Sequence, residues 1–160
     1  MKKKILIIRS ISMQQLDNLM SKLYTEYPED DLYILTHSHA IKRCEKYKNI
    51  TEIIDYERIN NFSIFHIPKN INEHDFDIII IPVTNISGVG FFNVFLMSLR
   101  IKSKKLFLYN LQSKKKERKK REIIFNFFKS ILFSTISIFV TIILSPFIIS
   151  HLLISKIITK

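Results

Sequence analysis

The sequence predicts an α/β fold, a parallel sheet with helices on both faces, followed by a C-terminal membrane helix. Two observations carry this prediction. Short apolar runs alternate with segments of helical spacing over residues 1–111, and strands separated by helices pair in parallel through right-handed crossovers. A run of twenty uncharged residues, Ser130 to Ile149, lies near the C-terminus. At about 1.5 Å per residue it is long enough to cross a hydrocarbon core of about 30 Å.

The first strand is predicted at residues 4–10, KILIIRS, because a nearly continuous apolar run is typical of a parallel strand buried on both faces. Residues 12–28 carry apolar side chains at spacings of three and four, with Ser12 as N-cap and Pro28 beyond the end. They are expected to form an amphipathic helix. Its apolar stripe consists of Met13, Leu16, Leu19, Met20, Leu23 and Tyr24.

Four further strands are predicted from apolar runs, at residues 31–37, 50–56, 76–83 and 104–110. The most apolar of them is FDIIIIPV at residues 76–83. Helical spacing returns at residues 91–100. Residues 57–75 have no clear period and are expected to form an irregular excursion.

The formal net charge of +11 is concentrated in the C-terminal part of the chain. Residues 1–100 hold twelve basic and twelve acidic side chains, whereas residues 101–160 hold thirteen basic and two acidic ones. The densest cluster, KKKERKKR, directly precedes the apolar tail and contains no aromatic residue that could stack on a base, which argues against nucleic acid as a partner. We expect its side chains to contact anionic lipids on the cytoplasmic face of a membrane. They are Lys114, Lys115, Lys116, Arg118, Lys119, Lys120 and Arg121.

The chain is therefore expected to divide into a cytoplasmic domain at residues 1–111, a basic juxtamembrane linker at 112–122 and a membrane helix at 123–158. The apolar core of the domain is expected to lie wholly before Arg121. Ser145 and Pro146 interrupt the tail, and proline removes a backbone hydrogen bond. Two arrangements stay open, a kinked span with Lys156 and Lys160 on the far side and a re-entrant helix that folds back at Ser145-Pro146.

A glycine-containing loop follows the strand at residues 76–83, at the end of the sheet where α/β proteins bind ligands. Gly88 and Gly90 form a GxG, but Asn93 stands in place of the third glycine of a dinucleotide fingerprint. No Gly-Lys-Ser or Gly-Lys-Thr of a nucleotide-binding P-loop occurs. Two interpretations stay open, a structural turn and a contact with a phosphate or sugar. The ligand-binding candidates are Thr84, Asn85, Ser87, Gly88, Gly90 and Asn93.

Other chemical motifs are weak. His37 and His39 alternate after the second strand, but no carboxylate or thiol at useful spacing completes a metal site, so no metal or cofactor is expected. Cys44 is the single cysteine and cannot form an internal disulfide, which suits a reducing cytoplasm. Arg9-Ser10 follows the first strand where a phosphoacceptor receiver would carry an acidic pair.

Residues 4–37, KILIIRSISMQQLDNLMSKLYTEYPEDDLYILTH, followed later by FDIIIIP, resemble the N-terminal half of the heptosyltransferase-like glycosyltransferases of the GT-B fold. In that family the first strand also ends in an Ile-Arg pair, and a Tyr-Pro precedes the second strand. The resemblance implies a Rossmann-like half domain over residues 3–110. The family has a Gly-Asp pair, with the aspartate as catalytic base, where this chain has Gln14 and Gln15. An amide cannot take a proton at neutral pH, so no catalytic residue is assigned.

The tail resembles the membrane helix of the polyprenol-phosphate sugar-1-phosphate transferases, in which a Ser-Pro break forms a re-entrant hairpin. Ser145 and Pro146 match that break, and Lys156 and Thr159 match the end of the second arm. Lys129 or Asn126 stands where that family has an aspartate, and the catalytic domain of the family is not found after the tail.

Both resemblances imply sugar transfer to a lipid carrier at the cytoplasmic membrane. The expected function is a membrane-anchored glycosyltransferase-like half domain of cell-envelope polysaccharide or glycolipid assembly. Its implied partners are a polyprenol-phosphate-linked glycan and a second glycosyltransferase subunit, and it is expected to be catalytically incomplete alone. The alternatives are a non-catalytic membrane-tethered scaffold and an N-terminal piece of a sugar-phosphate transferase.

Overall fold

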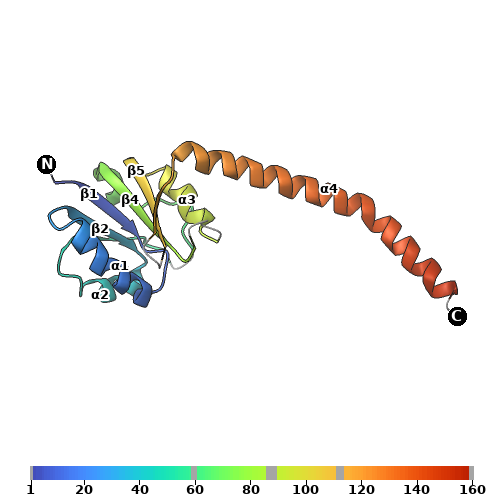
Figure 1. Ribbon diagram of the computed structural model, residues 1–160, viewed down its shortest axis with the longest axis horizontal. Helices are drawn as coiled ribbons and strands as arrows, with labels where there is room; N and C mark the ends of the chain where they lie inside the picture. Colours follow the sequence, from blue (N-terminus) through green and yellow to red (C-terminus); the bar gives the residue numbers. More distant parts are fainter. Residues whose placement is uncertain (1, 59–60, 86–89, 111–113, 159–160) are drawn as a thin grey trace. The chain divides into compact units, whose positions relative to one another are not determined.

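The protein forms two compact units, Met1–Ile123 and Ile124–Lys160. The structure is a computed structural model that describes residues 2–58, 61–85, 90–110 and 114–158, with side chains as far as Phe147. Within the first unit, strands and helices alternate along the chain as the sequence predicts (Figure 1).

The first unit is built on a six-stranded sheet with the order β3-β2-β1-β4-β5-β6. Neighbouring strands from β3 to β5 are parallel, and only the β5–β6 pair is antiparallel. The prediction of a parallel sheet is thus confirmed for the five strands expected from the sequence. The strands are β1 (Lys4–Ile8), β2 (Asp31–Thr36), β3 (Ile50–Asp55), β4 (Phe76–Val83), β5 (Ser103–Asn110) and β6 (Lys115–Glu117).

Helix α1 begins where the sequence predicts. The Ser12 hydroxyl accepts a hydrogen bond from the Gln15 backbone N–H, and the Gln15 side-chain oxygen accepts one from the Ser12 N–H. This reciprocal pair is a capping box, which satisfies two of the N–H groups that a helix start leaves without partners. The helical elements are α1 (Met13–Glu26), α2 (Ser38–Cys44), the 3-10 helix η1 (Lys69–Glu73), α3 (Phe92–Leu99) and α4 (Lys120–Ile158).

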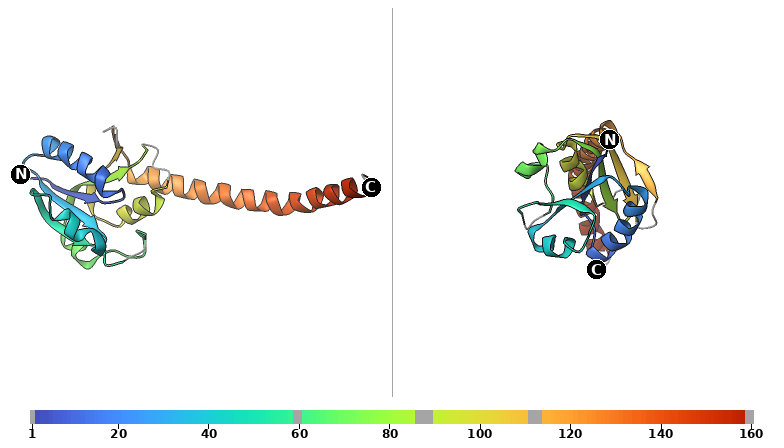
Figure 2. Two further views of the ribbon diagram at one scale, coloured as in Figure 1. Left: turned by 90° about the horizontal axis from the view of Figure 1, so that it is seen from below. Right: turned by 90° about the vertical axis from the view of Figure 1, so that its left-hand side faces the viewer.

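The sheet buries a separate apolar cluster on each face, because neighbouring residues of a strand point to opposite sides. On one face, Ile5 and Ile7 pack with the apolar stripe of α1 and with Cys44 of α2. On the other, Leu6 and Ile8 pack with residues of α3. Helices therefore cover both faces of the sheet, as expected (Figures 1 and 2). The α1 stripe buries Leu16, Leu19, Met20 and Leu23, and α3 buries Val94, Phe95 and Met97.

The described part of residues 57–75 has no α-helix, as the missing period predicts, and contains only η1. It nevertheless supplies two buried side chains, Phe62 and Ile71, to the same cluster as α3. This irregular segment thus covers the sheet face where a crossover helix between β3 and β4 would otherwise lie.

The basic segment after β5 is not simply a linker. Lys115–Glu117 form β6, which pairs with β5. Ile123, in the first turn of α4, is only 5% exposed and belongs to the buried cluster that includes α3. The Lys120 ammonium donates to the carbonyl of Ile101. The expectation that the core lies wholly before Arg121 is therefore wrong, because the start of α4 packs into the first unit.

Helix α4 is continuous from Lys120 to Ile158 and contains Pro146 in its interior. The chain therefore does not reverse direction at Ser145-Pro146 in this structure. Between Lys120 and Phe147 the helix is long and apolar enough to cross a membrane, and none of its most apolar stretch is buried against protein. Most of its large apolar side chains between Ile124 and Phe147 are exposed; among them are Phe128, Phe133, Phe139, Ile142 and Phe147.

Candidate functional site

The strand order reverses between β1 and β4. From β1 the chain proceeds to β2 and β3 on one side, and β4 then lies on the other side of β1. The loops that leave the carboxyl ends of β1 and β4 therefore diverge, and parallel α/β sheets bind ligands in the crevice formed there.

A cleft of about 290 Å³ occupies this position. We call it the switch-point cleft. Its lining comes from the segment after β1, the residue after β2, the irregular segment and the start of α3. The lining residues are Arg9, Ser10, Ile11, His37, Asn61, Phe62, Gly90, Phe91, Asn93 and Val94.

Arg9 is the first residue after β1 and is half-buried. Its Nε donates to Thr36 Oγ1 over 2.6 Å, and its Nη1 donates to the carbonyl oxygen of Ile11 over 3.3 Å. Both acceptors are neutral. Burial lowers the pKa of the Arg9 guanidinium, but a guanidinium is so strongly basic that the group stays charged at neutral pH. The cleft thus holds a fixed positive charge.

His37 is buried, at 8% exposure, and precedes α2 as its N-cap residue. Its ring lies 4.5 Å from that of Phe62, 5.2 Å from that of Tyr56 and 5.7 Å from that of His39, measured between centroids. The two histidines therefore stack on each other within an aromatic cluster. Among the described residues no group of three or more histidines, cysteines or acids could hold a metal ion.

Of the predicted loop residues that the structure describes, two lie at the cleft, Gly90 and Asn93. Gly90 has a φ of +89°, which L side chains rarely adopt, and Asn93 lies exposed in the first turn of α3. Thr84 and Asn85 form an exposed bend after β4 and are not among the lining residues. Ser87 and Gly88 lie outside the described residues.

Several lining residues were not predicted. Asn61 and Phe62 come from the irregular segment, which has no periodicity to place it over a particular strand end. Phe91 precedes α3 and carries no motif. Arg9 could have been identified, because a charged residue directly after the first buried strand of a parallel sheet lies at the ligand-binding edge.

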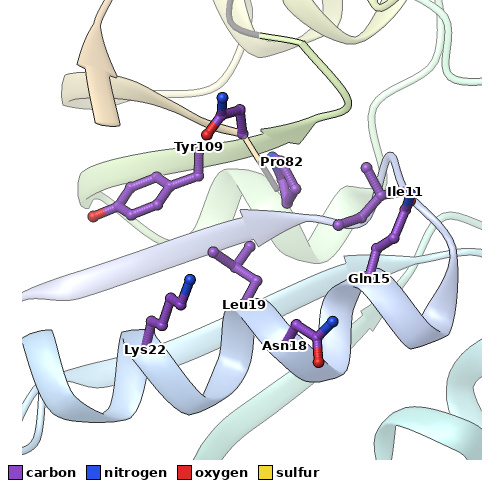
Figure 3. A pocket seen from close by; sticks show the side chains of 8 residues that line it. Ile11, Gln15, Asn18, Leu19, Lys22, Pro82 and Tyr109 are labelled. Atoms are coloured by element: carbon purple, nitrogen blue, oxygen red, sulfur yellow. The ribbon is translucent and has the colours of Figure 1, made fainter. Parts of the chain in front are cut away.

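A second, smaller hollow lies between α1 and the ends of β4 and β5 (Figure 3). Ile11 lines both this hollow and the switch-point cleft. The free volume of the smaller hollow is about 10 Å³, room for one water molecule at most. Gln15 lines it, but the side-chain oxygen of Gln15 is engaged in the capping box of α1. This hollow is too small for a substrate, and Gln15 has a structural role there.

Lys115 differs from the rest of the basic cluster. Its ammonium contacts Glu26 Oε1 at 2.5 Å and Tyr27 Oη at 2.7 Å, and lies 4.2 Å from the centre of the Phe107 ring. Burial alone would lower the pKa of Lys115, but the hydrogen bonds to Glu26 and Tyr27 raise it. Lys115 thus joins β6 to the end of α1.

The other basic side chains of the cluster divide into two groups. Arg118 pairs with Glu122 at 3.7 Å, and Lys120 bonds Ile101 as described above. Four are exposed and free to meet a charged surface: Lys114, Lys116, Lys119 and Arg121.

No protein-family model, curated protein or solved structure matches the chain. The chemistry of the cleft follows from its own residues. It combines one guanidinium, two amide side chains, an open backbone position at Gly90 and the aromatic side chains of Phe62 and Phe91. Such a set of residues can bind an anionic group that is part of a small organic molecule. The described lining residues include no carboxylate that could act as a general base.

Proposed function

We propose that this chain is a membrane-tethered, glycosyltransferase-like half domain that binds its ligand in the switch-point cleft. It acts together with a partner in the assembly of cell-envelope polysaccharide or glycolipid. One observation carries the proposal: the unit that contains the cleft ends inside α4, at Ile123, and the described helix up to Phe147 is apolar, with none of its most apolar stretch buried against protein. A ligand-binding unit continuous with such a helix works on molecules at a membrane surface.

The strand order supports a Rossmann-like half domain. The order 3-2-1-4-5 of parallel strands, with helices on both faces, is that of the doubly wound sheets that bind phosphorylated ligands at the switch point. The resemblance of residues 3–110 to the N-terminal half of GT-B glycosyltransferases adds the link to glycan assembly. Exposed lysines and arginine beside the apolar helix suit the cytoplasmic face of the membrane.

The need for a partner rests on the missing base. Gln14 and Gln15 stand where the resembling family has a catalytic aspartate, and the described cleft lining holds no acid. His37 is the one histidine among the described lining residues, but it is buried within an aromatic cluster. The absence of an acid from the described cleft lining also favours a second candidate function, that of a non-catalytic binding module that presents its ligand to another protein.

The function can be tested in membranes from the source cells. The chromosomal copy is deleted, and the incorporation of radiolabelled sugar into lipid-linked glycan is measured after return of one of three proteins. These are the wild-type chain, Asn93→Trp, which fills the cleft, and Asn72→Trp, a matched change on exposed η1. We expect the wild type and Asn72→Trp to restore incorporation and Asn93→Trp to fail.

Two results would contradict the proposal. If deletion leaves the incorporation of sugar unchanged, the chain does not act in glycan assembly. If the purified chain alone transfers sugar from a sugar nucleotide at a substantial rate, it needs no partner.

A further inference from the structure

The switch-point cleft has an uncompensated positive charge. Its described lining contains Arg9 and no aspartate or glutamate, and Arg9 takes part in no ion pair among the described residues. Arg43 also acts on Arg9 electrostatically, so this neighbour adds positive charge and neutralises none. Burying a cation in part without a carboxylate costs free energy, which an anionic ligand would recover.

The guanidinium of Arg9 is also held in place before any ligand arrives. Its two hydrogen bonds, to Thr36 Oγ1 and the Ile11 carbonyl, use two of its five N–H groups. Thr36 is fully buried at the end of β2, so this support is rigid. The remaining N–H groups find no acceptor within the described residues. A pre-oriented arginine of this kind suits bidentate contact with an oxyanion.

The start of α3 lies in the same cleft and favours phosphate over carboxylate. Phe91, its N-cap residue, offers no side-chain acceptor to the first N–H groups of the helix. The backbone at Gly90 is open, because nothing lies within 4 Å of the place where a Cβ would stand. A phosphate has three terminal oxygens, enough to meet the guanidinium and helix N–H groups together.

The size of the cleft and its other lining residues limit the part of the ligand that would carry the phosphate. Its volume of about 290 Å³ is at the lower limit of ordinary ligand sites, which excludes a dinucleotide. Phe62 and Phe91 offer ring surfaces, and the amides of Asn61 and Asn93 offer hydrogen bonds. A single small ring or a short chain fits these walls.

We propose that the switch-point cleft binds a phosphate monoester, with its phosphate between Arg9 and the start of α3. This inference rests on the proposed function, because it names the ligand class of the same cleft. The same phosphate chemistry is present in a free sugar phosphate and in the headgroup of a prenyl phosphate lipid. The structure supplies partners for both, amides for sugar hydroxyls and rings for an apolar chain.

The test uses the full chain in micelles of octaethylene glycol monododecyl ether, a detergent without phosphate or sugar. Isothermal titration calorimetry measures the binding of glucose 1-phosphate, geranyl phosphate, glucose and glucuronate. We expect at least one of the two phosphate monoesters to bind at least about tenfold more tightly than glucose or glucuronate. Preference for glucose 1-phosphate identifies a free sugar phosphate, and preference for geranyl phosphate identifies a lipid headgroup.

Variants of two arginines distinguish binding in the cleft from attraction by the positive charge of the protein as a whole. Arg9→Gln removes the cleft charge, and Arg43→Gln removes a neighbouring exposed charge that does not line the cleft. We expect affinity for the phosphate monoester to fall by about tenfold or more in Arg9→Gln and by less than about twofold in Arg43→Gln. Asn93→Asp places a negative charge in the cleft without touching the hydrogen bonds of Arg9, and we expect it to weaken binding to the same degree.

The outcomes are distinct. If neither phosphate monoester binds to the folded chain, or if Arg9→Gln and Arg43→Gln weaken binding equally, the inference is wrong. If glucose or glucuronate binds in the cleft and the phosphates do not, the ligand class is wrong while the cleft remains a binding site of the proposed function. If phosphate binds as expected but deletion leaves glycan assembly unchanged, the function is wrong and the ligand class stands.

Discussion

The Ser145 hydroxyl donates a hydrogen bond of 3.1 Å to the carbonyl oxygen of Ile142. This carbonyl lies four residues before Pro146, so it is the acceptor that the missing proline N–H would have met in a regular helix. A serine directly before the proline thus supplies a hydrogen bond where the backbone cannot. It explains how α4 continues through Pro146.

The first prediction concerns this pair. Ser145→Ala should destabilise α4 by about 0.5 to 1 kcal/mol, because the Ile142 carbonyl loses its donor. Pro146→Ala restores a backbone N–H, so Ser145→Ala should have almost no effect in that background. Thermal unfolding of the helix in micelles, followed by circular dichroism for the two single variants and the double variant, gives the coupling. Equal effects of Ser145→Ala in both backgrounds would show that the hydroxyl does not compensate for the proline.

The second prediction concerns the boundary between the two units. A chain that ends at Ile123 should fold and remain soluble without detergent, since the apolar helix is removed and the buried residue is kept. A chain that ends at Glu122 should be less stable by roughly 2 to 4 kcal/mol, because it leaves a cavity beside α3. The urea midpoints of the two proteins give the difference. Equal midpoints would mean that Ile123 does not contribute to the core.

The third prediction concerns Gly90. Gly90→Ala should lower the free energy of unfolding by about 1 kcal/mol, because alanine is strained at a φ of +89°. Steric conflict should not add to this cost, since a Cβ there meets nothing within 4 Å. Guanidinium unfolding of the first unit measures the change. Alanine placed at exposed Asn72 is the control, and a loss of stability there as large as at Gly90 would contradict the backbone explanation.

The fourth prediction concerns acid stability. Burial alone would raise the pKa of Glu26, but hydrogen bonds from Lys115, Tyr109 and Tyr27 bring it below the ordinary value. A carboxylate with a lowered pKa stabilises the folded protein above its ordinary pKa near 4, and this stabilisation is lost as the pH falls through the lower folded-state pKa. Wild type should therefore be more stable than Glu26→Gln at pH 6, on the order of 1 kcal/mol or less.

The two proteins should converge at low pH, where Glu26 is protonated. Urea midpoints measured from pH 6 down to pH 2.5 test this, with Glu29→Gln as an exposed control in the neighbouring turn. A difference that stays constant over the whole range would contradict a role of the ionised carboxylate.

The regular elements of the fold could be predicted because each has a local signal. The run at 76–83 has the bounds of β4 as expected, and the capping residue Ser12 fixes the start of α1. Strand β6 has no such signal, since three charged residues carry no apolar pattern and only the pairing with β5 makes them a strand. Ile123 was missed because it begins an apolar run whose described residues up to Phe147 are otherwise largely exposed, and the sequence alone does not distinguish the one buried residue from the others.

The candidate site was predicted only in part for a similar reason. Gly90 and Asn93 were identified from the glycine pattern and lie at the cleft, whereas Asn61 and Phe62 reach it through an irregular segment. Tertiary packing decides where such a segment lies, here through the burial of Phe62 and Ile71. Its sequence shows no hydrophobic periodicity from which that path could be predicted.

Strand β6 forms one edge of the sheet, and all three of its residues are charged. Lys115, Lys116 and Glu117 form the outermost strand beside β5, where an open row of N–H and C=O groups would invite the sheet of another molecule to pair. A strand of three charged residues is too short and too strongly solvated to serve as a template for such pairing. Tethering to a membrane would confine copies of the domain to two dimensions and raise their encounter rate. At this edge of the sheet, a strand of charged residues would then disfavour pairing between crowded neighbours.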